Sequence, residues 1–371
     1  MATITQIRGA LLEEAVLFLL EKVGYVTVDA GSLASRPVEG MRSGHSGLEV
    51  RGRGTWHQLD ALALWRYSPA FMYPLQLIVE AKCYSSRRPV GVEIPRNAVG
   101  VLKDISESYF SFRGRQRTFQ APRYNYVAAI FSTSGFSRGA VEYAVAHQVF
   151  LIQYEGVPVI QPLIDAIFEF DEECISIRGQ NAIAAARRYY RAKLTEVEES
   201  LPDRHSLTEK GRDLLDGSIA EACRQIRGSY FGMLQGRWPM HLLRTAPLPP
   251  SAFLQDTVKC EVVGNDQGEW TFVPANTQRS ENRWFELEFS LPQEVADLVA
   301  GSWDDPVAVA NIKEEYFSYI DLSGKIGEIR RNIRLELDRD WIRKYIDGRR
   351  VRIRGQSEDK GLGSNGTDLN P

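Results

Sequence analysis

The segment from Leu75 to Tyr84 constrains the fold of this chain most strongly. It is an apolar run, typical of a buried strand, that contains Glu80 and Lys82 two residues apart. Strand side chains alternate between the two faces of a sheet, so these two charges point the same way. Burying charged groups costs free energy unless they have partners or a chemical role. We therefore expect a central strand with a charged site on one face.

A second acid, Asp60, interrupts another apolar run, and a turn-rich connection separates that run from Leu75. If the two runs form a hairpin centred near Ala70, Asp60 lies opposite Glu80, and Gln58 lies opposite Lys82 on the same face. Two carboxylates and a lysine at one point suit a divalent cation and a water molecule to be activated. The plainer alternative is a buried Glu–Lys pair, with Asp60 capping a turn.

The flanking segments predict alternating helices and strands. An amphipathic helix over residues 5–23 carries Glu13 and Glu14, of which Glu13 lies nearer the apolar face and Glu14 is expected to be more exposed. A further helix starts near Pro95, and Ser137 is a suitable N-cap for another helix that ends at 146. Strands are expected at 48–52, 57–65, 75–84, 126–132 and 149–154. Such alternation indicates an α/β fold, with a mixed sheet covered on both faces.

In this order the segments resemble the PD-(D/E)xK nuclease superfamily and, within it, the Mrr-like restriction endonucleases. The resemblance covers about residues 5–155, less than half of the chain. The matching elements are Leu-Glu13 with Gly24-Tyr25 eleven residues later, then Asp60, Glu80-Ala-Lys82 and Thr133-Ser-Gly-Phe-Ser137. The chain departs from several Mrr-like enzymes in having Glu80 where they carry Gln, so the more usual acidic form of the site applies.

The resemblance implies a restriction-endonuclease-like fold and a metal-dependent endodeoxyribonuclease of restriction or anti-phage defence. Asp60, Glu80 and the carbonyl of Ala81 would hold Mg²⁺ or, in its place, Mn²⁺. Lys82 would position or activate the hydrolytic water, and Glu13 would support the metal site. Two alternatives stay open: a DNA-repair or junction-processing nuclease of the same superfamily, and a non-cleaving DNA-binding or scaffold subunit of a defence complex.

Basic residues gather after the Glu80-Ala-Lys82 triplet. Residues 85–123 hold eight lysines and arginines against three acids, although the whole chain has a net charge of −3, so any DNA surface must be local. Phe112 and Phe119, which flank three arginines at 113–117, could stack on bases. A solvated loop with ordinary surface arginines is the alternative. The residues expected to contact DNA are Arg51, Arg53, Gln58, Arg87, Arg88 and Arg96.

Composition agrees with a chain of two globular domains. The four cysteines are scattered without metal-binding spacing, which argues against a zinc site or a disulfide framework and favours a reducing compartment. No stretch approaches about 18 consecutive apolar residues, and the amino terminus has no basic segment before its apolar helix. We expect a cytoplasmic protein that does not bind membranes.

The chain is expected to divide into a nuclease domain at 1–160, a helical linker at 161–204, an α+β domain at 205–354 and a disordered tail at 355–371. The segment 207–215 resembles part of a winged helix, but a capped surface helix is the preferred interpretation. Residues 325–354 contain eleven basic residues against five acids, which fits a recognition or sensor surface or a dimer interface edged with salt bridges. Because a duplex cut requires chemistry on both strands, a homodimer is expected, and a defence-system partner protein is possible.

Overall fold

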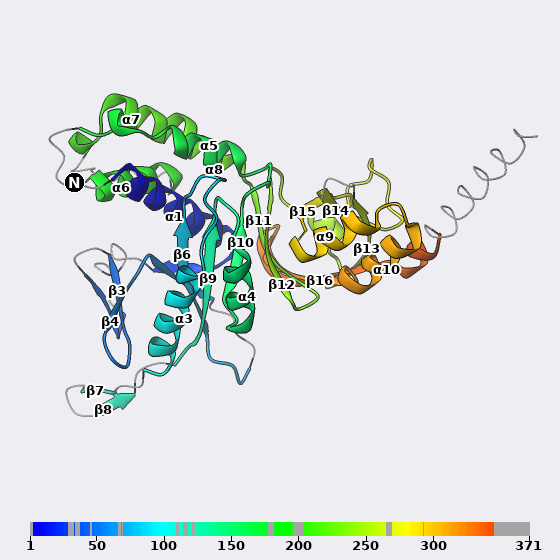
Figure 1. Ribbon diagram of the computed structural model, residues 1–371, viewed down its shortest axis with the longest axis horizontal. Coiled ribbons are helices and arrows are strands. Elements are labelled where there is room, and N and C mark those ends of the chain that lie inside the picture. The colour runs from blue at the N-terminus through cyan, green and yellow to red at the C-terminus, as the bar shows by residue number, and fades with distance from the viewer. Residues whose placement is uncertain are drawn as a thin grey trace, which may run out of the picture. The chain divides into compact units, whose positions relative to one another are not determined.

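The computed structural model describes residues 3–28, 33, 38–44, 47–65, 68, 70–108, 111–113, 118–120, 123–176, 182–195, 204–264, 269–291 and 293–344. The chain divides into two compact units (Figure 1). The first unit comprises Met1–Tyr230 with Leu243–Pro247, and the second comprises Phe231–Leu242 with Leu248–Pro371. The division therefore falls near residue 230 and not at 160 or 204, the boundaries expected from the sequence.

A five-stranded mixed sheet forms the centre of the first unit. The strands lie in the order β1-β5-β6-β9-β10. Their bounds are β1 (Val26–Val28), β5 (Ala61–Trp65), β6 (Leu75–Lys82), β9 (Asn125–Ser132) and β10 (Phe150–Gln153). β5 pairs antiparallel with β1 and β6, whereas β6, β9 and β10 run parallel to one another. The expected α/β class with a mixed sheet is confirmed.

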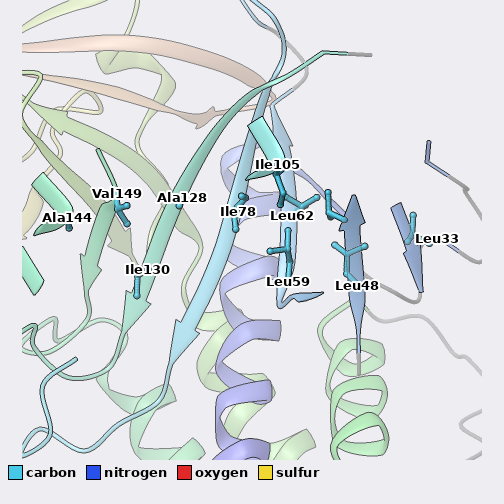
Figure 2. Close-up of a cluster of buried hydrophobic side chains, with 11 residues drawn as sticks. Leu33, Leu48, Leu59, Leu62, Ile78, Ile105, Ala128, Ile130, Ala144 and Val149 are labelled. Carbon is cyan, nitrogen blue, oxygen red and sulfur yellow. The ribbon is translucent and has the colours of Figure 1, made fainter. Parts of the chain in front are cut away.

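Helices cover both faces of this sheet. α1 (Ile4–Val23) begins with a capping box between Thr3 and Gln6 and packs against β5 and β6. α3 (Glu93–Ser106) and α4 (Arg138–Ala146) lie on the other face, where they close a core that includes Ile78, Ile105 and Ile130 (Figure 2). Glu80 and Lys82 lie two and four residues after Ile78 along β6, so all three point to the same face, which is the α3 side of the sheet.

A smaller antiparallel sheet adjoins this core. It consists of β2 (Met41–Ser43), β3 (Leu48–Arg51) and β4 (Trp56–Leu59), and a separate hairpin is formed by β7 (Ser111–Arg113) and β8 (Thr118–Gln120). The chain bends at Asp60, between β4 and β5, so the single strand expected at 57–65 is two strands in two sheets. Gln58 consequently pairs with Glu49 of β3, and its expected place opposite Lys82 is wrong.

The helices after residue 160 pack within the first unit. They are α5 (Gln161–Glu169), α6 (Ala182–Thr195), α7 (Glu209–Asp213), the π-helical turn η3 (Leu214–Ile219) and α8 (Ala220–Gln225), with short 3₁₀ turns η1 (Glu172–Cys174) and η2 (Arg204–Ser206). α6 and α5 contact α1, so the region 161–204 is part of the first unit and not a linker. The Thr208 hydroxyl caps α7 by accepting a hydrogen bond from the backbone N–H of Gly211.

The second unit is built on a seven-stranded sheet in the order β12-β11-β16-β17-β13-β14-β15. The strand bounds are β11 (Gly228–Leu234), β12 (Trp238–Arg244), β13 (Thr257–Gly264), β14 (Glu269–Pro274), β15 (Leu287–Ser290), β16 (Tyr319–Ile326) and β17 (Ile329–Leu337). The helices are α9 (Gln293–Ser302) and α10 (Pro306–Tyr316), and η4 (Pro250–Ala252) is a 3₁₀ turn. Stacked aromatic rings such as Trp270 on Phe317, 5.0 Å apart, fill the core.

Most cations of the described part of 325–354 are paired with acids. Arg334 of β17 forms two hydrogen bonds with Asp321 of β16, at 2.7 and 2.9 Å, and Arg331 pairs with Asp256 at 2.5 Å. Neighbouring ion pairs join Lys325 to Glu328, Arg339 to Glu314 and Arg343 to Asp340. This pattern fits a surface edged with salt bridges. The tail expected at 355–371 lies outside the described residues.

Candidate active site

The β5–β6 pairing brings Asp60 to the level of Glu80. Ala61 pairs with Val79 and Trp65 with Leu75, which is the register predicted from the hairpin. Extending it by one residue places Asp60 opposite Glu80. The bend after β4 therefore leaves Asp60 at the end of β5, beside the charged end of β6.

Asp60 is a partly buried acid, one of whose carboxylate oxygens is fully buried and unsatisfied. Its Oδ2 atom is shielded from solvent and has no hydrogen-bond partner among the described residues. Burial and the nearby charge of Glu80 raise the pKa of Asp60 to about 6, although Lys82 and a hydrogen bond from the backbone N–H of Ala81 oppose the rise. A buried carboxylate oxygen without a donor is costly, and a bound cation would satisfy it.

Lys82 forms an ion pair with Glu80 on the same face of β6. Burial alone would lower the pKa of Lys82, but attraction from Glu80 and Asp60 outweighs it and raises the pKa above the ordinary value. The lysine therefore remains an ammonium group at neutral pH. In that form it can donate hydrogen bonds to a water molecule or a phosphate oxygen.

The oxygen atoms of Asp60 and Glu80 fit a hard divalent cation such as Mg²⁺. Mg²⁺ is commonly held by one or two carboxylates and keeps other positions for water and phosphate oxygens. Within the described part of the chain, no group of three or more His, Cys, Asp or Glu side chains is placed to hold a metal ion. A metal ion at this point would therefore be held by two carboxylates, a backbone carbonyl oxygen and oxygen atoms of the substrate. The Ala81 carbonyl stays a predicted ligand.

The two acids of α1 are both engaged by α6. Glu13 forms an ion pair with Arg187, and Glu14 receives two hydrogen bonds of 2.7 Å from Arg191. Glu14 is 2% exposed and Glu13 7% exposed, so the expectation that Glu14 is the more exposed acid is wrong. The described contacts of Glu13 therefore join α1 to α6, and its support of a metal site stays a prediction.

The predicted DNA-contacting arginines are exposed and occupy two regions. Arg51 ends β3, and Arg53 follows it and forms a 3.4 Å ion pair with Glu107. Arg87, Arg88 and Arg96 lie after β6, in the loop and in the first turns of α3. Gln58 is also exposed, in β4. The side chains of the aromatic and basic segment 112–119 lie outside the described residues.

The structure gives partners to two further residues, Tyr84 and His57, to which the sequence assigns no role. Tyr84 lies two residues after Lys82, just beyond the end of β6, and its charge interaction favours the ammonium form of Lys82. His57, given no role from the sequence, lies 2.6 Å from Asp104 of α3 through its Nε2 atom. The spacing 80, 82, 84 was available to identify Tyr84, whereas nothing in the sequence links His57 to Asp104.

The Thr133-Ser-Gly-Phe segment holds the chain that follows Lys82. The Thr133 N–H donates to the Lys82 carbonyl at 3.1 Å, and the Thr133 hydroxyl donates to the Tyr84 carbonyl at 2.7 Å. The Ser134 hydroxyl donates to the Arg88 carbonyl at 2.9 Å. These buried hydroxyls fix the course of the loop and thereby the outer edge of the site.

No helix in the described part of the chain is long and apolar enough to cross a membrane. No protein-family model and no curated protein matches the chain. Among solved structures, a protein of unknown function, AF1548, is similar to it with 16% sequence identity and a TM-score of 0.33. That similarity covers 57% of this chain and 95% of that protein.

Proposed function

We propose that this chain is a metal-dependent endodeoxyribonuclease that hydrolyses phosphodiester bonds of DNA, in restriction or anti-phage defence. The observation that carries the proposal is the buried, unsatisfied Oδ2 atom of Asp60, opposite Glu80 and beside Lys82. A buried acid with a raised pKa near a second acid and a lysine is typical of a reactive site. The restriction-endonuclease-like fold that the sequence resembles is part of the same proposal.

Each residue has a distinct role in the proposed reaction. Asp60 and Glu80 would hold Mg²⁺, which when bound lowers the pKa of its water and stabilises negative charge on the phosphate. Lys82, kept protonated by both acids, would orient the attacking water and donate to a phosphate oxygen. The exposed arginines at 87, 88 and 96 would bind neighbouring phosphates without reading sequence.

Supercoiled plasmid incubated with the protein in Mg²⁺, Mn²⁺ or EDTA tests this proposal. We expect metal-dependent nicking or linearisation that is lost in Lys82→Ala, with the fold retained by circular dichroism. Lys210→Ala is a matched control, because Lys210 also pairs with two acids, Asp171 and Glu173, at 2.7 and 2.8 Å. Cutting that persists in Lys82→Ala would contradict the proposed site.

The same assay separates the alternatives. DNA binding without cutting in any metal favours a scaffold subunit, and cutting confined to branched DNA favours a junction-processing enzyme. Homodimer formation is part of the proposal, because both strands must be cut. A dimer predicts linear product without accumulation of nicked circles, together with a dimer mass in sedimentation. A defence-system partner would be sought only if the protein binds DNA but needs a further factor to cut it.

A further inference from the structure

The loop after β6 presents a stacked tyrosine and arginine next to Lys82. The guanidinium carbon of Arg88 lies 4.7 Å from the centre of the Tyr84 ring. Tyr84 lies two residues beyond the end of β6, and Thr133 hydrogen-bonds to the carbonyls of both Lys82 and Tyr84. The Tyr84 and Lys82 side chains also interact electrostatically. An arginine at the surface is therefore held above a residue that borders the candidate active site.

The backbone of this loop is fixed at several points. In addition to the bonds from the Thr133 and Ser134 hydroxyls, the Arg88 N–H donates to the Ser85 carbonyl at 2.9 Å. The Val90 N–H donates to the Gly135 carbonyl at 2.9 Å, and Val90 is completely buried. A loop anchored in this way carries its exposed side chains in a defined position, so little conformational entropy is lost when they bind a ligand.

Arg88 also differs from other arginines of the first unit in its partners. Arg42 and Arg53 pair with the acids Glu49 and Glu107, whereas Arg88 has no carboxylate within ion-pair distance among the described residues. Stacking on a ring occupies the flat face of a guanidinium and leaves its N–H edges available. Those edges match the geometry of a phosphate group.

We propose that Tyr84 is a positioning residue, which holds the Arg88 guanidinium for a DNA phosphate next to the one that is cut. This inference rests on the proposed nuclease function. It adds a role for Tyr84: the contact between Arg88 and the phosphate depends on the aromatic ring of Tyr84 and not on its hydroxyl. Loss of the ring should therefore weaken DNA binding as loss of Arg88 does.

Fluorescence anisotropy with a labelled duplex in EDTA, at several salt concentrations, tests the inference. We expect Tyr84→Phe to bind as the wild type does, because the ring is kept. Tyr84→Leu and Arg88→Ala should each weaken binding several-fold, and each should reduce the salt slope by about 0.9, the value of one phosphate contact. In the double variant the two losses should not add, because they remove one contact.

Tyr319→Leu is the matched control. Arg334 stacks on Tyr319 at 4.2 Å but is already paired with Asp321, so its loss should leave DNA affinity unchanged. Wild-type affinity in Tyr84→Leu would overturn the inference, and so would losses that add in the double variant. If the wild-type protein still cuts plasmid, either outcome leaves the proposed nuclease function standing. A wild-type protein that neither binds nor cuts DNA would instead refute the proposed function and this inference together.

Discussion

Arg191 of α6 donates two hydrogen bonds of 2.7 Å to the carboxylate of Glu14 in α1, across 177 residues of sequence. Glu14 is almost fully buried, whereas the Arg191 side chain keeps 37% of its surface exposed. Arg187 extends the pair by binding Glu13, and burial together with repulsion from Arg191 lowers the pKa of Arg187 to about 10. These two arginines tie α6 to the first helix of the chain.

Arg191→Ala is expected to destabilise the protein by about 3 kcal/mol, because it leaves the buried Glu14 carboxylate without its main partner. Urea unfolding followed by circular dichroism measures this change. Arg188→Ala, at an exposed position of the same helix, is the control and should change stability by less than about 0.5 kcal/mol. Equal losses of unfolding free energy in the two variants would show that the Arg191–Glu14 pair stabilises the protein no more than an exposed arginine does.

This pair explains why the domain boundary could not be predicted. Composition changes after residue 160, but the ion pairs that join α6 to α1 connect positions too distant for any local pattern to reveal. β17 was missed for a different reason. Its buried residues Ile333, Leu335 and Leu337 alternate as a strand requires, but the many basic residues of 325–354 favour a charged surface stretch when only the sequence is considered.

Alternation did predict the centre of the candidate site. It placed Glu80 and Lys82 on one face, and symmetry of the hairpin gave the register that sets Asp60 opposite Glu80. The bend at Asp60 was not predictable, because it depends on the burial of Leu48 and Leu59 where the smaller sheet joins the core. That tertiary packing turns β4 away and removes Gln58 from the side of Lys82.

The raised pKa of Asp60 predicts a characteristic pH dependence of stability. The unfolded chain loses this proton near pH 4, whereas the folded protein keeps it to about pH 6. Stability contributed by this group is therefore lost as the pH rises from 4 to 6. Asp60→Asn should stabilise the metal-free protein at pH 8 by roughly 1–3 kcal/mol and should have no effect below pH 4.

A divalent cation should reverse this penalty, since it binds the ionised carboxylate. We expect Mg²⁺ to raise the melting temperature of the wild type at pH 8, with a much smaller shift at pH 5. Asp60→Asn should lose most of the shift at pH 8. A Mg²⁺ effect that is equal at both pH values, or that survives in Asp60→Asn, would place the cation elsewhere.

Asp104 is expected to fix the β3–β4 hairpin against α3. Its carboxylate lies 2.6 Å from His57 Nε2 and accepts a hydrogen bond of 2.9 Å from the Gly54 N–H, and these contacts lower the pKa of Asp104. Asp104→Ala should make amide exchange at Gly54 about tenfold faster, the effect of losing one or two hydrogen bonds. Hydrogen exchange of the full chain measures this.

Glu107→Ala is the control for that experiment. Glu107 directly follows the same helix and contacts the same hairpin, but only through a 3.4 Å ion pair with exposed Arg53. Such exposed pairs contribute little, so exchange at Gly54 should stay close to that of the wild type. If both variants accelerate exchange equally, the hairpin is held by general packing and not by the Asp104 contacts.

Phe71, in the connection between β5 and β6, combines full exposure with an unfavourable backbone. Its φ of 69° lies in the left-handed region, where a side chain costs about 1–2 kcal/mol, and its ring is completely exposed. Phe71→Gly removes this strain without loss of burial and should be about 1 kcal/mol more stable than Phe71→Ala, which keeps it. Equal unfolding free energies of the two variants would show that the connection relaxes away from this conformation. A difference in the expected direction, without any change in DNA binding, would show that the strain serves neither the fold nor the proposed site.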